Sequence, residues 1–187
     1  MSTESNDLIN TPDAARLIFG LRDTGYNFSM AVADIVDNSI AANASNVYVD
    51  VLLTNDGRKF VYFADDGDGM DFAMLKNAMR YGAKQRENLA SLGKFGLGLK
   101  TASSSVCLKF SLISRTDKTS PLRKLSWDLE HVKENDVWEM LEEDITPEES
   151  SRFSDYCGDK GTLLVWSKCD RLLKKSYSEP GGAQEKA

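Results

Sequence analysis

The chain has 187 residues, of which 41% are hydrophobic, and this is enough to bury one substantial core, so a single domain is expected. Asp and Glu number 29 against 23 Lys and Arg, and the net charge of −6 argues against a domain that grips a nucleic-acid backbone over a wide surface. One histidine and three widely separated cysteines argue against a histidine-rich metal cluster, a paired-cysteine metal site and a disulfide framework.

The sequence contains no segment near the ~18 consecutive apolar residues that cross a bilayer, and its N-terminus has no basic start followed by an apolar run. We therefore expect a soluble protein without a membrane partner. Unpaired cysteines fit a reducing compartment, which predicts the cytoplasm, or the nucleus if the source is a eukaryote. Any nucleic acid is expected to be held by another domain.

Two helices are predicted in the N-terminal part of the chain. The sequence TPD at 11–13 combines a capping hydroxyl, a proline at the first helical position and an early acid, so a short helix is expected over AARLIFGL. Asn27 or Ser29 is expected to cap a longer, largely buried helix through MAVADIVDNSIAANA.

A β-hairpin and a third helix are predicted next. Residues 46–54 and 58–65 are rich in β-branched and aromatic side chains, and the Asn-Asp-Gly turn between them is a strong hairpin signal. Residues 71–82 predict a helix that ends at Gly82. The segment 83–96 is polar and punctuated by glycines without a clear period, so we interpret it as a mobile lid.

The C-terminal half predicts further elements of the same sheet. A helix is expected over 97–106, and VCLKFSLISRT and LRKLSWDLEHV are interpreted as two strands joined through DKTSP. VWEMLEE predicts a short strand, TPEE at 146–149 begins another helix, and 161–169 predicts a final apolar strand. The tail 171–187 is predicted to be disordered or to begin a second domain.

Helices interspersed with antiparallel hairpins, rather than regular strand-helix-strand units, indicate the fold class. We expect an α+β two-layer sandwich with a mixed, mostly antiparallel sheet packed on helices. Residues 1–170 are expected to form this domain.

Three polar side chains interrupt the apolar second helix. Asp34 and Asn38 are four residues apart and therefore share one face, and Asp37 lies nearby. If that face is buried, it needs a ligand, an ion or a hydrogen-bond network. Alternatively, these groups only cap or solvate the edge of a helix.

The sequence DDGDG at 65–69 follows an apolar strand. A carboxylate at the end of a strand, followed by two glycines, suits a turn that brings backbone close to a planar ligand, and Asp65 can accept a hydrogen bond from an exocyclic amine. Read alone, the pattern is more typical of an ordinary turn, because Asp-Gly clusters are usually turns. It is not a calcium loop, because no bidentate Glu follows at the twelfth position.

The glycine-rich segment 93–101, GKFGLGLKT, precedes a predicted helix start. Free N–H groups and the helix dipole favour a phosphate at such a position. The segment is not a Walker loop, because Leu99 separates Gly98 from Lys100. It is not the dinucleotide fingerprint either, because its order is GxxGxG and no strand precedes it.

Taken in order, DIVDNSIAANAS, DDGDGM, LGKFGLGLKTAS and GTLLV resemble the four motifs of the gyrase, heat-shock chaperone, histidine kinase and MutL (GHKL) superfamily. The version that they resemble most is the microrchidia (Morc)-like group. The motifs run from Asp34 to Val165. The resemblance implies the Bergerat ATP-binding fold, Mg²⁺ and ATP or ADP as ligands, and a nucleotide-dependent homodimer.

The resemblance also implies roles at the phosphate end of the nucleotide. In this family a carboxylate of the first motif activates the attacking water and an asparagine four residues later binds Mg²⁺, and the matching residues are Asp34 and Asn38. The glycine-rich motif covers the phosphates, and the matching residues are Gly93, Lys94, Phe95, Gly96, Leu97, Gly98, Leu99 and Lys100.

The remaining motifs imply an adenine site. The aspartate of the second motif holds the adenine amino group, which points to Asp65, while Gly67 and Gly69 make room for the base. Met70 is expected to pack on the ring. Thr162 matches the threonine that supports adenine binding through Asp65 and a water.

Two departures from the family pattern bear on activity. The family usually has Glu where this chain has Asp34, and the shorter side chain would place its oxygen roughly 1–1.5 Å further from the water, which costs on the order of 10²-fold in rate. Many relatives also have a second, transducer domain whose lysine reaches the γ-phosphate, and residues 170–187 are too few for one.

Three functions follow from these expectations. The first is an ATPase that hydrolyses ATP slowly and uses it to close a lid and dimerise. The second is an ATP-binding switch without turnover. The third is a histidine-kinase-type phosphotransferase, which is disfavoured because no helix pair with a phospho-accepting histidine precedes the domain and because TAS follows the glycines, as in the chaperone and Morc branch.

Overall fold

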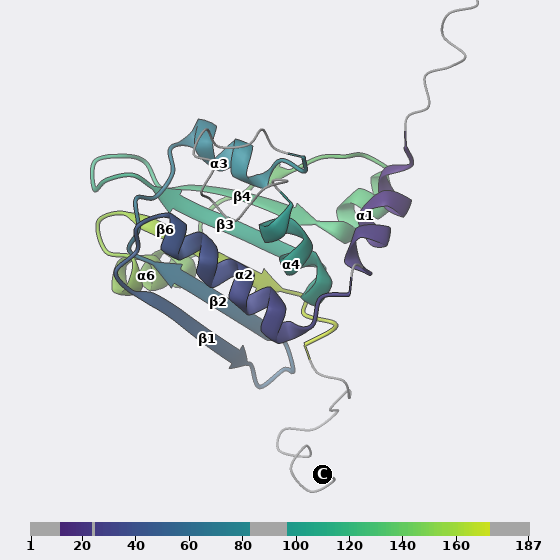
Figure 1. Ribbon diagram of the computed structural model, residues 1–187, viewed down its shortest axis with the longest axis horizontal. Coiled ribbons are helices and arrows are strands. Elements are labelled where there is room, and N and C mark those ends of the chain that lie inside the picture. Colours follow the sequence, from purple (N-terminus) through teal and green to yellow (C-terminus); the bar gives the residue numbers. More distant parts are fainter. Residues whose placement is uncertain (1–11, 24, 83–96, 173–187) are drawn as a thin grey trace, which may run out of the picture.

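The computed structural model describes residues 12–23, 25–82 and 97–172, and a six-stranded sheet lies at its centre (Figure 1). The strands are β1 Val47–Leu53, β2 Lys59–Asp65, β3 Lys109–Arg115, β4 Arg123–Asp128, β5 Leu141–Glu142 and β6 Gly161–Ser167. Their order across the sheet is β1-β2-β6-β3-β4-β5, and each neighbouring pair is antiparallel. The last strand therefore lies between the second and the third, which brings residues distant in sequence together.

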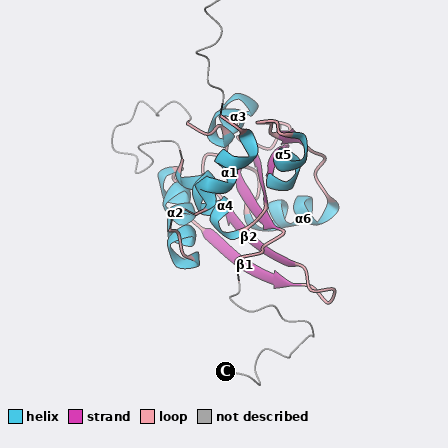
Figure 2. Cartoon of the chain, turned by 90° about the vertical axis from the view of Figure 1, so that its right-hand side faces the viewer, coloured by secondary structure: helices cyan, strands magenta, loops and turns pink. Residues whose placement is uncertain are grey.

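The helices of the described residues cover the two faces of this sheet unequally. They are α1 Ala14–Arg22, α2 Phe28–Ala41, α3 Phe72–Met79, α4 Gly98–Val106, α5 Leu129–Asn135 and α6 Pro147–Tyr156. Helices α2 and α4 pack together on one face, α1 contacts α4 and α5, and α3 contacts β3 and β4. Helix α6 covers the other face against β2 and β6 (Figure 2). The predicted α+β class, an antiparallel sheet packed on helices, is confirmed.

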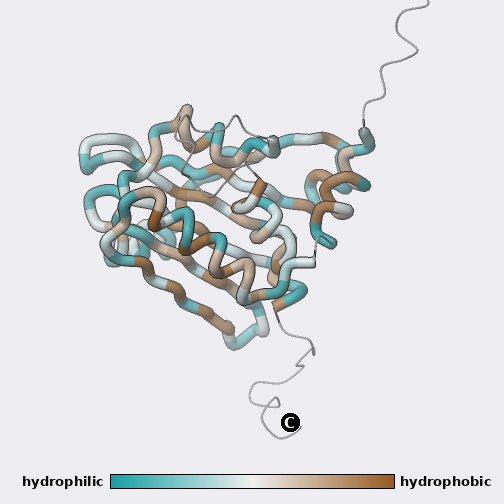
Figure 3. The backbone as a smooth tube through the Cα atoms, viewed as in Figure 1, coloured by the Kyte–Doolittle hydropathy of each residue, from teal (hydrophilic) through white to brown (hydrophobic). Residues whose placement is uncertain are grey.

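The core follows from the alternation of side chains along the central strands. The face under α2 and α4 carries Val61, Phe63, Phe110, Leu112, Leu164 and Trp166. The face under α6 carries Tyr62, Ala64, Ile113, Leu163 and Val165. Because β2 and β6 are buried on both faces, their sequences are nearly continuous apolar runs, which Figure 3 shows as brown stretches along the strands.

Several local signals in the sequence are confirmed. The Asn27 side chain caps α2 by accepting a hydrogen bond from the Met30 N–H at 2.9 Å. Thr146 and Glu149 form the complete capping box that begins α6. The predicted hairpin is the β1–β2 pair, with Gly57 at φ +80 in its turn.

The first and third helices differ slightly from the prediction. Helix α1 is capped by the Asp13 side chain, which accepts from the Arg16 N–H at 2.8 Å, whereas Thr11 lies outside the described residues. Helix α3 ends at Met79 rather than at Gly82, because Arg80 already has an extended backbone (ψ 128). The predicted lid 83–96 and most of the tail, 173–187, also lie outside the described residues.

Two predictions for the strands were wrong in their extent. The strand predicted over LRKLSWDLEHV ends at Asp128, and the remainder forms α5, because Asp128 accepts a hydrogen bond from the Glu130 N–H at 3.2 Å and starts the helix. Leu129 and Val132, three residues apart, then bury one helical face. The predicted strand VWEMLEE contains only the two-residue β5.

Candidate functional site

Helix α2 presents Asp34 and Asn38 on the side that faces α4. The half-buried Asp34 carboxylate accepts a hydrogen bond from the Tyr26 hydroxyl at 2.5 Å, and the exposed Asn38 donates its Nδ2 to the Asp34 backbone carbonyl at 2.7 Å. A Cβ built on Gly98, the first residue of α4, would lie 3.6 Å from Asp34 Oδ2. The carboxylate of α2 and the start of α4 therefore face each other.

The N-cap residue of α4 provides no side-chain cap. Leu97 occupies this position with αR backbone angles, and among the described residues its side chain makes no capping hydrogen bond to the first turn. An uncapped helix N-terminus offers N–H groups and a partial positive charge to an anion. Gly98 thus lies beside Asp34 at the helix start where the sequence predicts phosphates, with Leu97 and Leu99 adjacent to it in the chain. Gly93, Lys94, Phe95 and Gly96 lie outside the described residues.

Lys100 lies in the interior, away from the Asp34 carboxylate. It is 2% exposed, and its Nζ donates a hydrogen bond to the Ala78 carbonyl near the end of α3 at 2.9 Å. Burial lowers the pKa of Lys100 to about 8. In this arrangement Lys100 holds α3 rather than reaching the space between α2 and α4, and the phosphate role expected for it stays a prediction.

Asp65 ends β2 in a buried, hydrogen-bonded position and is 7% exposed. Its Oδ2 accepts from the Ser39 hydroxyl at 2.9 Å, and its Oδ1 accepts from the Gly67 N–H at 3.0 Å. Burial raises the pKa of Asp65, and the bonds from Gly67 and Ser39 partly oppose that rise. Ser39 directly follows Asn38, so α2 contacts both parts of the candidate site.

The turn after Asp65 is packed so closely that side chains are excluded at two positions. A Cβ on Gly67 would lie 2.6 Å from the Ala42 carbonyl oxygen, and a Cβ on Gly69, which has φ +67, would overlap the carbonyl oxygen of Arg115. Glycine at these positions is therefore a steric requirement of the fold. Backbone, rather than side chains, forms this wall of the site.

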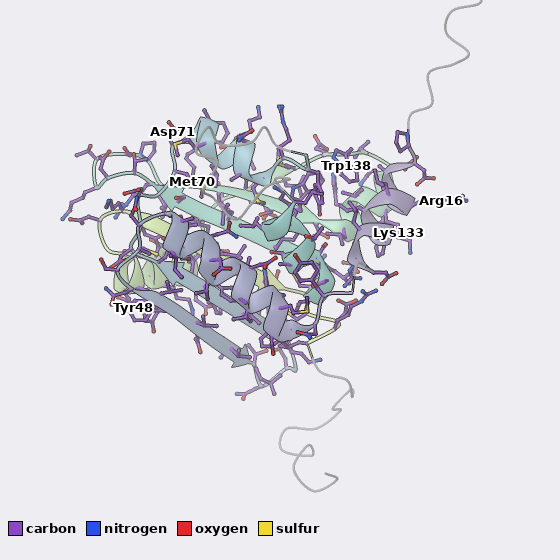
Figure 4. All side chains as sticks on the ribbon, viewed as in Figure 1. Arg16, Tyr48, Met70, Asp71, Lys133 and Trp138 are labelled. Atoms are coloured by element: carbon purple, nitrogen blue, oxygen red, sulfur yellow. The ribbon has the colours of Figure 1, made fainter. Side chains whose placement is uncertain are left out.

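Thr162 lies beside this turn because β2 and β6 pair in a register that sets it opposite Asp65. Its hydroxyl is 3.2 Å from that of Ser114 on β3. Ser114 Oγ also accepts from the Met70 N–H at 2.9 Å and donates to the Gly161 carbonyl at 2.6 Å. Figure 4 labels Met70 next to Asp71, the residue that caps α3. Asp65, Gly69, Met70 and Thr162 are thus brought together.

Sequence reasoning did not single out Tyr26, Ser39, Ser114 or Gly161. Gly161 has φ +136, and a Cβ there would overlap the carbonyl oxygen of Asp65. Ser39 had a usable signal, because a serine four residues after the buried Ile35 places a polar group on a buried helix face. Tyr26 and Ser114 had none, because their contacts depend on how separate elements pack.

A metal ion would depend on ligands beyond a protein cluster. Within residues 12–23, 25–82 and 97–172, no group of three His, Cys, Asp or Glu side chains is placed to hold a metal ion. Asn38 is exposed, and its amide oxygen is not the atom used in its bond to Asp34. These residues therefore fit an ion that is held mainly by a ligand's own oxygens and by water.

A separate cavity of about 250 Å³ lies on the opposite face, between the β1–β2 hairpin and α6. Tyr48, labelled in Figure 4, lines it together with Tyr62, Arg152 and Tyr156. The Arg152 guanidinium stacks 3.8 Å from the centre of the Tyr62 ring and donates to Asp50 at 2.8 Å. None of the residues predicted to bind a ligand lines this cavity.

None of the helices in the described ranges is long and apolar enough to span a membrane.

Comparison with known proteins adds independent information. Residues 26–161 match the sequence model of the family described as histidine kinase-, DNA gyrase B-, and HSP90-like ATPase. The chain is 28% identical over 163 residues to Protein MICRORCHIDIA 2 of Arabidopsis thaliana. This alignment covers 78% of this chain and 26% of that protein. It is 30% identical over 96 residues to Protein MICRORCHIDIA 6 of the same plant, covering 49% of this chain and 14% of that protein.

A human protein also matches. The chain is 30% identical over 93 residues to ATPase MORC2 of Homo sapiens, covering 48% of this chain and 9% of that protein. The chain thus spans about a quarter or less of the length of these relatives.

Proposed function

Because the chain belongs to the family of histidine kinase-, DNA gyrase B- and HSP90-like ATPases, we propose that it binds Mg-ATP between α2, the turn after β2 and the start of α4, and hydrolyses it slowly. ATP binding and ATPase activity in general follow from the family and from its likeness to an ATPase, MORC2. The magnesium ion, the residue roles, lid closure and dimerisation are our proposals.

The observation that carries the proposal is the buried Asp65 carboxylate beside a wall of backbone. A carboxylate is an acceptor only, and this one lies at the edge of a turn in which no Cβ fits at Gly67 or Gly69. An adenine ring offers an amino group to such an acceptor and a flat face to such a wall. We propose that Asp65 binds the amino group, that Thr162 supports it, and that Met70 packs on the ring.

The second part of the proposal concerns the phosphates. The start of α4 at Gly98, where Leu97 makes no side-chain cap, lies beside Asp34, and α2 links this position to Asp65 through Ser39. A nucleotide with its base at Asp65 would thus extend along α2 toward α4. Asn38 would contribute one oxygen to Mg²⁺, which would neutralise charge on the phosphates. Gly93, Lys94, Phe95 and Gly96 are proposed to complete the phosphate cover.

Asp34 is the proposed general base for water. Its Oδ2 lies 3.6 Å from where a Cβ of Gly98 would be, at the start of α4. The Asp34 side chain is one methylene shorter than the glutamate usual in the family. We therefore propose slow turnover. A second candidate is a switch that binds ATP without hydrolysing it, which the same short side chain favours.

Steady-state phosphate release, measured together with ATP affinity, separates these two functions. Under the first, turnover is low, Asp34→Asn abolishes it while ATP affinity stays within a few-fold, and Asp34→Glu raises it. Under the second, neither wild type nor Asp34→Glu releases phosphate although both bind ATP. Turnover that Asp34→Asn leaves unchanged would contradict the role of Asp34 and make Asp37 the next candidate.

The wider organisation is also proposed. We propose that residues 1–170 form the nucleotide-binding domain, that 83–96 closes over bound ATP, and that closure promotes association with a second copy. Sedimentation with and without a non-hydrolysable ATP analogue tests the association. The three cysteines are buried and unpaired, which supports a reducing compartment, the cytoplasm or a eukaryotic nucleus. We propose no membrane partner, and no nucleic-acid binding through this domain alone.

A further inference from the structure

We propose that Tyr26 is a positioning residue, whose hydroxyl holds the Asp34 carboxylate in the orientation that activates water. The contact is a hydrogen bond of 2.5 Å from the Tyr26 hydroxyl to Asp34 Oδ2. This inference rests on the proposed function, because it gives Tyr26 a part in ATP hydrolysis. It concerns a residue outside the four motifs, eight positions before Asp34.

Tyr26 is itself held firmly, which a positioning residue requires. It occupies the short connection between α1 and α2, where Gly25 has φ +86 and Asn27 caps α2. The residue is half-buried, and its side chain packs against the main core. The backbone on both sides of Tyr26 and the packing of its ring thus limit the movement of the hydroxyl.

The Asp34 carboxylate needs such a partner. The terminal torsion of an aspartate is broad, so the carboxylate of a half-buried side chain can pivot unless one oxygen is fixed. A short hydrogen bond from a hydroxyl to a carboxylate is among the stronger ones in proteins. Because the Tyr26 bond takes Oδ2, the oxygen nearest to Gly98, it fixes the carboxylate plane and leaves Oδ1 outside that bond, available to accept a hydrogen bond from a water.

The electrostatic surroundings of Tyr26 agree with this geometry. The pKa of Tyr26 is raised first by its hydrogen bond to Asp34, then by burial and by the charge of Asp34, while Thr101 on α4 lowers it. The hydroxyl therefore lies between α2 and α4, where Asp34 also faces Gly98. As the pKa is raised, Tyr26 keeps its proton at neutral pH and remains a donor.

The alternative is that Tyr26 only fastens the α1–α2 connection to α2. That role predicts a loss in the free energy of unfolding of Tyr26→Phe and no selective loss of kcat. A positioning role predicts that kcat falls while KM and ADP affinity stay the same, because Tyr26 contacts the general base Asp34 and not the groups proposed to bind the adenine and the phosphates. Displacement of a general base by a fraction of an ångström is expected to lower kcat by about 10-fold to 100-fold.

The experiment compares wild type, Tyr26→Phe and the control Tyr48→Phe, which removes the hydroxyl of a 44% exposed tyrosine on β1. ADP binding by calorimetry is measured first, then kcat and KM for ATP. We expect all three proteins to bind ADP within about twofold and only Tyr26→Phe to lose kcat. Equal kcat in Tyr26→Phe and wild type would overturn the inference while leaving the proposed function in place.

A second measurement needs no Tyr26 variant and therefore does not depend on its folding. The six tyrosines, labelled with ¹³C at Cζ, are titrated by NMR in wild type and in Asp34→Asn. Burial also raises the pKa of Tyr62 and Tyr81, so the response to Asp34→Asn identifies Tyr26: we expect one raised pKa to move down in this variant and the other tyrosine pKa values to stay the same. If no tyrosine pKa moves down in Asp34→Asn, the contact is overturned. If wild type binds ADP but does not hydrolyse ATP, only the positioning role of Tyr26 is overturned. If wild type does not bind ADP, the proposed function is removed as well.

Discussion

The two ends of the candidate site are built differently. At Asp65 both carboxylate oxygens are engaged, the side chain is 7% exposed, and the neighbouring glycines pack against backbone carbonyls. At Asp34 the carboxylate is half-buried, Asn38 is exposed, and the N-cap residue of the facing helix, Leu97, makes no side-chain cap. The end proposed to bind the adenine is therefore held by contacts within the described residues, whereas the end proposed to bind the phosphates has groups that a ligand would complete.

For the proposed ATP site, this difference predicts which end supplies binding affinity and which end sets the rate. Groups that are already fixed by packing lose little conformational entropy when they bind a ligand, so the base end is expected to supply recognition. Groups at an open helix start can follow the charge and geometry of the phosphates. Substitutions at the base end should thus change binding, and those at the phosphate end should change Mg²⁺ dependence and rate.

The largest effect is expected from Gly69→Ala, which adds a methyl group in the closely packed turn after Asp65. The new Cβ would overlap the Arg115 carbonyl, so the turn must move, and we expect a loss of about 3 kcal/mol or more in the free energy of unfolding together with loss of ADP binding. Gly57→Ala is the matched control, because Gly57 also has positive φ but nothing within 4 Å. Urea unfolding measures both variants. Equal losses would show that backbone angle, rather than packing, explains the glycine at 69.

The second largest effect is expected from Lys100→Met, which tests whether the Lys100 side chain stays in the protein interior or lies near the proposed phosphate site. Its pKa falls from 10.5 in the unfolded chain to about 8 in the fold, so the unfolded state binds the proton more tightly between these pH values. The stability of wild type relative to Lys100→Met should therefore rise by about 3 kcal/mol from pH 8 to 10.5.

The difference between the two proteins is the quantity to measure, because the thiols of Cys157 and Cys169 have a pKa of 9.0 in the unfolded chain and about 12 in the fold, and so they also change the free energy of unfolding in this pH range. Chemical unfolding at several pH values supplies it. A flat difference would mean that the Lys100 ammonium is solvated in the folded protein, within reach of phosphates.

Asp65→Asn should separate binding from stability. The variant is expected to bind ADP more weakly by about 1–3 kcal/mol, because an acceptor-only group becomes an amide. Folding raises the pKa of Asp65 above 3.8, so stability that is present below pH 3.8 is lost as pH rises through the folded-state pKa. At neutral pH the buried charge is therefore a cost, and the variant should be at least as stable as wild type.

Asp66→Asn is the control for this prediction. The half-buried Asp66 accepts hydrogen bonds through its carboxylate from the Ser45 and Asn46 N–H groups, and bonds from Asn46 lower its pKa. This variant should lose a little stability and keep its ADP affinity. Calorimetry and urea unfolding of the pair give both quantities, and a similar loss of affinity in both variants would contradict the special role of Asp65.

The smallest effect is expected at Asn38, on the open end. Asn38→Ala removes one proposed oxygen ligand from an ion that phosphates and water otherwise hold, so the enhancement of ATP affinity by Mg²⁺ should fall by about 1 kcal/mol. ATP titrations with Mg²⁺ and with EDTA measure the enhancement. The same enhancement in variant and wild type would remove Asn38 from the metal site, while affinity in EDTA should not change.

Much of this architecture was predictable because its signals are local. The Asn27 cap, the capping box of Thr146, the β1–β2 hairpin and the apolar strands each depend on neighbouring residues. Helix α5 was missed because an apolar and polar mixture such as DLEHV suits a strand or a helix, and the Asp128 cap decided it.

In the candidate site too, the residues that were predicted lie close together in sequence, and those that were missed come from separate elements. Asp65 and its glycines were predicted from their spacing in one short turn, whereas Ser114 was not, because its neighbours come from the register that places β6 between β2 and β3. The contact of Tyr26 with Asp34 likewise depends on how the α1–α2 connection returns toward α2 and α4. Contacts between elements far apart in sequence carry no local pattern.

The most direct test of the central claim is a calorimetric comparison of ADP with inosine diphosphate, whose base has a carbonyl oxygen in place of the adenine amino group. If Asp65 accepts a hydrogen bond from that amino group, wild type should bind ADP at least about tenfold more tightly than inosine diphosphate, and Asp65→Asn should lose this preference. Equal affinity for the two nucleotides in wild type, or an undiminished preference for ADP in Asp65→Asn, would contradict the placement of adenine at Asp65.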